Sequence, residues 1–178
     1  MASFLDRAVG AARLDARTYE EVEADPTAMG QAMAVVGAAA LAAGVGSFGS
    51  GAVTAVGLVV AGFLGWLLWA AVTWLIGTKV LPEPGTSADL GQLLRTIGFS
   101  AAPGLLNVLG IIPVVGLVVT FVAAVWQLAA MVVAVRQALD YRSTGRAVLV
   151  CFIGWIVYLA ISIGFTLIRG LGSAMLGG

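Results

Sequence analysis

Long apolar runs fill most of this chain and are separated by short polar breaks. A helix needs roughly 20 residues to cross about 30 Å of hydrocarbon. Five runs reach or approach that length, and they cover residues 28–47, 52–77, 96–112, 114–135 and 147–168. The third is short and contains Pro103, Gly104 and Asn107, which leaves a full crossing and a re-entrant segment as alternatives. We predict an all-α, polytopic membrane helix bundle with five transmembrane helices.

The first 25 residues form a charged lead-in that holds nine of the eighteen charged residues. Apolar side chains recur in it every three to four positions, at Leu5, Val9, Ala12, Ala16 and Tyr19. This spacing predicts a short N-terminal helix that is cytoplasmic or lies along the inner headgroups. A merely solvated segment is the alternative. We therefore divide the chain into a lead-in (1–25), a membrane domain (26–170) and a Gly-rich outer tail (171–178).

Helix-capping patterns mark two of the polar breaks. Asp25-Pro26 suits an N-cap followed by a first helical position, so the first span is expected to begin there. In the break from Thr78 to Arg95, Ser87 is expected to cap a short helix whose apolar residues share one face.

Composition narrows the classes of function. The chain is 61% hydrophobic and 10% charged, with a mean hydropathy of +1.06, whereas soluble domains are about 45–50% apolar and about 25% charged. Histidine is absent and Cys151 is the only cysteine, which excludes histidine-based triads and a disulfide framework. Basic and acidic residues cancel, so we expect no nucleic-acid partner. The pattern contains no nucleophile–base pair and no metal-ligand spacing; we expect neither an enzyme nor a cofactor.

The distribution of Lys and Arg predicts an orientation. With the N-terminus inside, eight of the nine basic residues flank the inner ends of the spans, and Arg169 alone lies outside. Because cytoplasmic loops carry the excess of basic residues, we expect a cytoplasmic N-terminus and an outer C-terminus. All nine acidic residues fall on the same inner side. Any protein partner is therefore expected at the cytoplasmic face or within the membrane.

Small and polar residues inside the spans are candidates for helix contacts. Gly57, Ala61 and Gly65 recur at four-residue spacing, which lets helices approach closely in lipid. Ordinary packing within the bundle and a homo-oligomer seam are both open. Asn107 and Gln127 are expected to form hydrogen bonds between helices, with a substrate path as the alternative.

Three short motifs resemble the Yip family of Ypt/Rab-interacting, five-pass membrane proteins. They are the Gly-Phe-Ser-Ala-Ala-Pro element at 98–103, the Ile-Pro-Val-Val-Gly turn at 112–116 and the Asp-Tyr-Arg-Ser-Thr-Gly-Arg-Ala segment at 140–147. The residues that carry this resemblance are Gly98, Phe99, Pro103, Pro113, Asp140, Arg142, Ser143 and Arg146. The frequent Ala, Gly and Val and the preference for Arg over Lys resemble a bacterial member of the family. The resemblance implies five spans with an inner N-terminus.

The resemblance also bears on partners. Eukaryotic members of the family carry an Asp-Leu-Tyr-Gly-Pro element before the first span, and only Asp25-Pro26 of it remains here, which argues against GTPase binding. We predict a non-enzymatic scaffold or accessory subunit in a bacterial inner membrane, in contact with lipid and with other membrane proteins or itself. A small oligomeric channel or transporter component, or a membrane-shaping protein, is the alternative.

Overall fold

The computed structural model describes residues 2–46, 51–112 and 114–176. This part of the chain consists of helices and connecting loops and contains no strand. Five of its helical segments are long and apolar enough to cross a membrane, which confirms the predicted number of spans. They are Pro26–Gly46, Val56–Val80, Leu90–Ile111, Val115–Ala138 and Thr144–Ile161.

The spans are built from α-helices and from short 3₁₀ and π-helical elements. In chain order they are η1 (Pro26–Ala28), α3 (Met29–Gly46), α4 (Gly51–Leu75), η2 (Ile76–Val80), α5 (Leu90–Phe99), η3 (Ala102–Ile111), α6 (Val115–Ala138) and α7 (Thr144–Leu176). Of these, η1 and η3 are 3₁₀ and η2 is π-helical. Asp25 caps the first of them, because its side chain accepts a hydrogen bond from the Thr27 amide. The N-cap predicted at Asp25 is thus confirmed, and the helical span begins at Pro26, two residues before the predicted run 28–47. At the other end of the chain, α7 continues as far as Leu176, through most of the segment expected to be a tail.

Two short helices, rather than one, make up the N-terminal lead-in. They are α1 (Phe4–Ala12) and α2 (Ala16–Ala24). Leu14 between them has a φ of 63°, in the left-handed region that cannot continue a helix. Because the chain turns there, the single apolar face expected from the spacing does not form. Leu5 and Val9 are exposed, whereas Tyr19 is fully buried.

The third span differs from its prediction in start and in shape. It begins at Leu90 rather than near residue 96, and its cap is Asp89 instead of Ser87. Asp89 accepts from the Gln92 amide while the Gln92 side chain accepts from the Asp89 amide, a reciprocal capping box. Beyond Phe99 the helix tightens into the 3₁₀ element η3, with Pro103 in its first turn. Proline is tolerated there because a first-turn amide has no partner within the helix.

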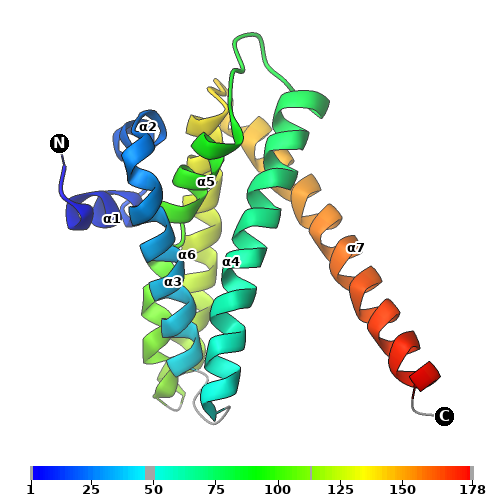
Figure 1. The fold of residues 1–178 in the computed structure, drawn as a ribbon. Helices are drawn as coiled ribbons and strands as arrows, with labels where there is room; N and C mark the ends of the chain where they lie inside the picture. Colours follow the sequence, from blue (N-terminus) through cyan, green and yellow to red (C-terminus); the bar gives the residue numbers. More distant parts are fainter. Residues whose placement is uncertain (1, 47–50, 113, 177–178) are drawn as a thin grey trace.

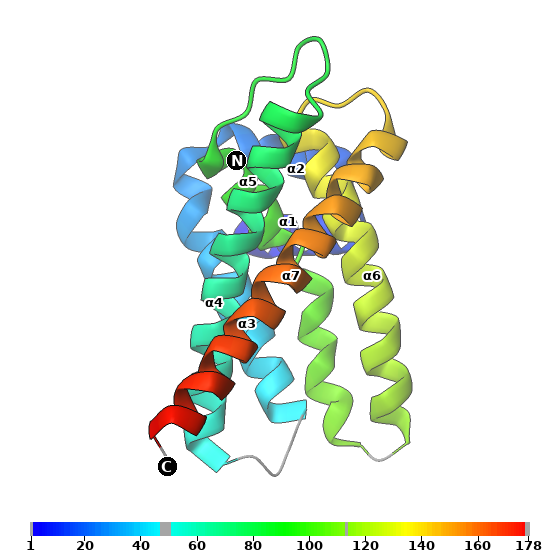
Figure 2. The same ribbon diagram turned by 90° about the vertical axis from the view of Figure 1, so that its right-hand side faces the viewer.

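Helices α3, α4, α5 and α6 run side by side, and η3 continues α5 between α3 and α6 (Figure 1). Helix α7 starts beside them and then leans away (Figure 1), crossing α4 obliquely when the molecule is turned (Figure 2). Helix α1 lies across the bundle rather than along it (Figure 1). One close approach depends on glycine: a Cβ added at Gly98 of α5 would lie 2.7 Å from Ala32 Cβ of α3. A larger residue at Gly98 would therefore force the two helices apart.

Candidate functional site

Most of the charged residues gather at one end of the bundle, which we call the charged end. It consists of α1, α2, the loop 81–89 between η2 and α5, and the loop 139–143 between α6 and α7. Both loops lie at the same end of the molecule in Figures 1 and 2. The charged end is thus assembled from segments that are far apart in the sequence.

A buried arginine joins α1 to α2 and α3. Arg7 is 3% exposed. Its Nε and Nη2 donate to Glu21 Oε1 at 3.1 and 2.9 Å, and Nη2 also donates to Asp25 Oδ2 at 2.7 Å. Its Nη1 donates to Gln31 Oε1 at 3.1 Å. A guanidinium can be buried only when its donors are satisfied, so these acceptors fix the position of α1.

The same contacts shift two pKa values. Burial alone would lower the pKa of Arg7, but the hydrogen bonds and charges of Glu21 and Asp25 outweigh it and raise that pKa. Hydrogen bonds from Thr27 and then from Arg7 lower the pKa of Asp25 to about 2. Both groups are therefore charged throughout the neutral range.

A second buried arginine joins α5 to α2. Arg95 is 7% exposed, and its Nε donates to the Val22 carbonyl oxygen at 3.0 Å. Its Nη2 donates to the carbonyl oxygen of Glu23. These carbonyls belong to the last turn of α2, where backbone acceptors have no partner within the helix. Arg95 therefore satisfies the end of α2 and holds it against the third span.

Glu23 lies beside this contact, among other acidic groups. Its Oε1 accepts from Gln92 Nε2 at 3.0 Å. Burial, followed by the charge of Asp140, raises the pKa of Glu23 to about 7, although Arg95 acts in the opposite direction. Glu23 is thus a group of the charged end that changes its charge near neutral pH.

The segment 140–146, which consists of the loop before α7 and the first residues of α7, contacts the loop 81–89. Asp140 has a φ of 53°. The Tyr141 hydroxyl donates to the carbonyl oxygens of Gly77 at 2.9 Å and Leu81 at 2.7 Å, around the end of η2. The amide of Arg142 donates to Glu83 Oε2 at 2.9 Å.

Arg146, in the first turn of α7, adds a second contact to the loop 81–89. Its Nη1 donates to the Pro82 carbonyl oxygen at 2.8 Å, and its Nε lies 3.4 Å from Glu83 Oε1. Ser143 and the Arg142 side chain are exposed. The residues of this motif therefore have two different roles. Tyr141 and Arg146 hold this segment against η2 and the loop 81–89, whereas the side chains of Arg142 and Ser143 face outward.

The other motif residues lie away from this loop. Gly98, Phe99 and Pro103 are buried inside the bundle, where α5 passes into η3. Pro113 lies outside the described residues. The structure thus does not bring the sequence-predicted motif residues together into one site; it distributes them between the packing core and the charged end.

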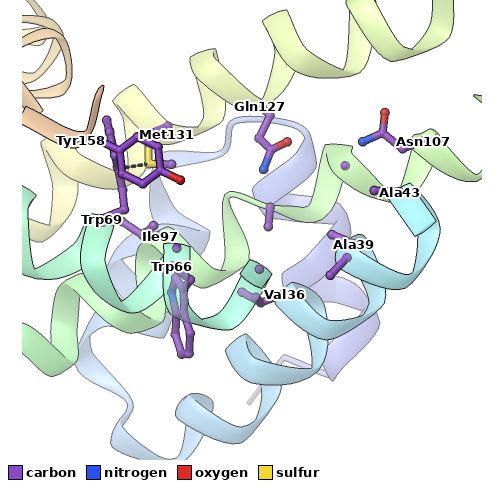
Figure 3. A pocket seen from close by; sticks show the side chains of 15 residues that line it. Val36, Ala39, Ala43, Trp66, Trp69, Ile97, Asn107, Gln127, Met131 and Tyr158 are labelled. Atoms are coloured by element: carbon purple, nitrogen blue, oxygen red, sulfur yellow. Dashed lines mark hydrogen bonds between the residues drawn. The ribbon is translucent and has the colours of Figure 1, made fainter. Parts of the chain in front are cut away.

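Asn107 and Gln127 do come together, at a cavity of about 330 Å³ in the middle of the bundle. The two amides lie on one side of it, with Trp66, Trp69 and Tyr158 on the other (Figure 3). Asn107 Oδ1 is buried and has no hydrogen-bond partner. The interhelical role expected for the two amides stays a prediction.

The small-residue row on α4 lies only partly inside the bundle. Gly57 and Ala61 are exposed in the single chain, and Gly65 is half-buried. A Cβ added at Gly65 would lie 3.9 Å from the Tyr158 hydroxyl, whereas nothing lies within 4 Å of one added at Gly57. The contact that α4 makes with α3 uses Gly62 instead, since a Cβ added there would lie 3.1 Å from Ala40 Cβ.

Sequence reasoning missed the two buried arginines. It placed Arg7 in the charged lead-in, as part of an interfacial helix or of a solvated segment, and Arg95 at the border of a polar break. In neither case did it predict burial, whereas both residues are nearly inaccessible. Their partners are between 14 and 73 residues away along the chain. Local spacing therefore carries no signal for them. Within the described ranges, no cluster of Cys, Asp and Glu is placed to hold a metal ion.

The fold and the composition define a polytopic, all-helical membrane protein with five spans and a helical N-terminal lead-in. The sequence model of the Yip1 domain matches residues 16–165, and the chain belongs to the Yip1 domain family. The resemblance found from the sequence motifs is thereby confirmed. No curated protein and no solved structure matches the chain.

Proposed function

We propose that this protein is a non-enzymatic scaffold or accessory subunit of a membrane complex, and that its charged end is the interaction face. In this proposal the membrane is a bacterial inner membrane, the charged end faces the cytoplasm and the C-terminus lies outside. The concentration of Lys and Arg at one end supports that orientation, since basic loops stay on the cytoplasmic side.

The observation that carries the proposal is the way in which the charged end is held. Arg7 and Arg95 bind α1 and α2 to α3 and α5 through buried, charge-assisted hydrogen bonds. Trp126 Nε1 of α6 also donates to the Ala12 carbonyl oxygen at the end of α1, at 2.6 Å. A lead-in fastened at several points presents a fixed surface, and a fixed surface loses less entropy on binding a partner.

The surface that remains is available to a partner. Arg13 and Arg17 are exposed, and their side chains make no hydrogen bond or salt bridge within the described ranges. Exposed arginines flanking a helix pair suit the acidic surface of another membrane protein or of a second copy. A GTPase is not the partner we propose, because only Asp25-Pro26 of the eukaryotic element is present.

Co-purification in a mild detergent tests the proposal. A photo-crosslinking residue at Arg17 should yield a defined partner or homo-oligomer, and one at Phe121, which is 69% exposed on the membrane-spanning part of α6, should not. The charge reversals Arg13→Glu and Arg17→Glu together should release the partner, since rim charges steer association. An isolated monomer, or the same crosslinks from both positions, would contradict the proposal.

The cavity favours a second candidate function, a small oligomeric channel or carrier. Asn107 and Gln127 both line it, and polar groups inside a membrane often mark a substrate path. Flux through reconstituted vesicles decides between the two. An absence of flux, or flux unchanged by Asn107→Ala and Gln127→Ala, would eliminate the carrier and leave the scaffold.

A further inference from the structure

A hollow with a volume of about 600 Å³ lies where α1 turns into α2. Its apolar lining comes from Leu5 and Val9, which are both exposed. Arg13, Asp6 and Asp15 supply its charged groups, and these three residues are exposed as well. The hollow thus combines an apolar part with one cationic and two anionic side chains.

The position of α1 places this hollow beside the membrane spans rather than beyond them. Helix α1 lies across the bundle, closer to its middle than α2 and the two loops of the charged end (Figures 1 and 2). Its last residue, Ala12, accepts from Trp126 Nε1 at 2.6 Å, and Trp126 lies near the middle of the span Val115–Ala138. Acyl chains offer an exposed charge neither a counter-charge nor a hydrogen bond. At this level a polar lipid headgroup is the group that suits the charged side chains.

The charged groups of the hollow have unused hydrogen-bonding capacity. The Arg13 side chain makes no hydrogen bond or salt bridge within the described part of the chain. Asp6 accepts from Ser3 through Oδ2, and Asp15 accepts one hydrogen bond at each oxygen. Because a carboxylate can accept about four hydrogen bonds, both acids can still bind a donor.

The arrangement of charges selects the class of headgroup. The guanidinium of Arg13 suits a phosphate. Asp6 and Asp15 outnumber this cation, so they disfavour a lipid whose only charge is its phosphate. A headgroup that also carries a primary ammonium brings a positive charge and N–H donors to the two acids. A trimethylated ammonium has the charge but no N–H to donate.

From this match of charges we propose that the hollow binds phosphatidylethanolamine from the membrane leaflet around α1. Arg13 donates to the lipid phosphate, and the lipid ammonium donates to Asp6 and Asp15. The acyl chains pass over Leu5 and Val9 into the bilayer. This site goes beyond the scaffold role and does not depend on it, although Arg13 borders both surfaces.

Native mass spectrometry of the full chain, purified in detergent without a partner, tests the proposal. Titrations with phosphatidylethanolamine, phosphatidylcholine and phosphatidylglycerol of the same acyl chains give a dissociation constant for each lipid. We expect the ethanolamine lipid to bind about tenfold more tightly than either of the others. Glycerophosphoethanolamine, which has the headgroup without acyl chains, should not displace it at the same concentration, because it leaves Leu5 and Val9 without a contact.

Two changes with matched controls locate the site. Arg13→Gln removes the positive charge and should raise the dissociation constant of the ethanolamine lipid about tenfold, whereas Arg17→Gln, on α2 outside the hollow, should leave it unchanged. Asp6→Asn and Asp15→Asn together keep an acceptor oxygen at each position and should remove the preference for ethanolamine over glycerol headgroups. Asp140→Asn neutralises an exposed acid of the loop 139–143 and should retain the preference.

Three results would overturn the proposal: equal dissociation constants for the three lipids, an unchanged constant in Arg13→Gln, or a headgroup preference retained in the double aspartate variant. Displacement by glycerophosphoethanolamine at equal concentration would also overturn it, because the ligand would then be a soluble headgroup rather than a lipid. The comparison of lipids uses the unmodified protein, so the proposal stays testable even where a variant fails to fold. Since no partner is present, the result is separate from the outcome of crosslinking at Arg17.

Discussion

At the scale of single residues, the charged end is organised by arginines that local sequence patterns treat as solvated. Arg7 reaches acceptors 14, 18 and 24 residues away. The planar guanidinium presents five donors in a fixed geometry, so it can join several segments at once. The pattern of charges therefore indicated where this end lies, but not which charges are buried in it.

Replacing Arg7 tests this role directly. Arg7→Met keeps a similar length of side chain but leaves Glu21, Asp25 and Gln31 without their donor. We expect the free energy of unfolding to fall by about 2–3 kcal/mol, below the upper range for broken buried pairs because the Glu21 side chain is 40% exposed. Chymotrypsin should then cleave faster at Tyr19, which is otherwise fully buried.

The matched control for Arg7 is Arg17→Met. Arg17 is exposed on α2, so its replacement should change the free energy of unfolding by less than about 0.5 kcal/mol. Equal effects of the two substitutions, in melting temperature and in cleavage rate, would show that Arg7 does not hold α1 in place.

Glu23 gives the charged end a pH dependence. Its pKa is about 7 in the folded protein against an ordinary value of 4.5, so between these values the folded state binds more protons than the unfolded state. Stability should therefore fall as the pH rises from about 5 to about 8. We expect the free energy of unfolding to fall by about 1 kcal/mol over this range. This is less than the full shift of the Glu23 pKa would give, because Glu23 is only partly buried.

Thermal unfolding in detergent across this pH range measures the effect. Glu23→Gln keeps the acceptor for Gln92 and should flatten the pH profile. Asp15→Asn keeps an N-cap on α2 and should preserve the slope. Asp25 does not contribute in this window, because its lowered pKa confines its effect to acid below about pH 4. A slope retained in Glu23→Gln would assign the pH dependence to another group.

At the scale of elements, the number of spans followed from apolar length, whereas their ends did not. Hydropathy depends on side-chain composition, and five runs of sufficient length are visible without any contact. The third span was predicted to begin near residue 96 because Arg95 looked like its border, yet Leu90–Phe99 is one helix with Arg95 buried in it. Tertiary hydrogen bonds from Arg95 to α2 made that extension favourable, and no local pattern reports them.

Gly98 tests how closely α5 and α3 must approach. Gly98→Ala places a Cβ 2.7 Å from Ala32 Cβ and 3.3 Å from Ala32 Cα, so the helices must separate. We expect a loss of about 1–3 kcal/mol in the free energy of unfolding, as for other overpacked cores.

The control for Gly98 lies on the opposing helix. Nothing lies within 4 Å of a Cβ added at Gly30 of α3, so Gly30→Ala should be neutral or stabilising by less than about 1 kcal/mol. Melting temperatures in one detergent compare the two. A loss in Gly30→Ala as large as in Gly98→Ala would show that the effect does not come from the contact between Gly98 and Ala32.

At the scale of the whole molecule, the separation of charge gives the bundle two different ends. Seventeen of the eighteen charged residues belong to the lead-in, the inner breaks or the helix turns beside them. The buried arginines and the contacts between the loops 81–89 and 139–143 explain why these charges stay together. The family and the fold were accessible from the sequence, whereas the cavity was not, since its lining comes from all five spans.

The orientation of these ends is the prediction on which the interaction face depends. In a Cys151→Ser background, Arg17→Cys and Ser143→Cys introduce exposed thiols at the charged end, and Val114→Cys introduces one at the opposite turn, where Val114 is 83% exposed. Because basic residues favour the cytoplasmic side, a membrane-impermeant maleimide should label only Val114→Cys in intact cells. It should label all three after permeabilisation. If Arg17→Cys and Ser143→Cys react from opposite sides, an odd number of spans separates them, and the two halves of the charged end cannot form one surface.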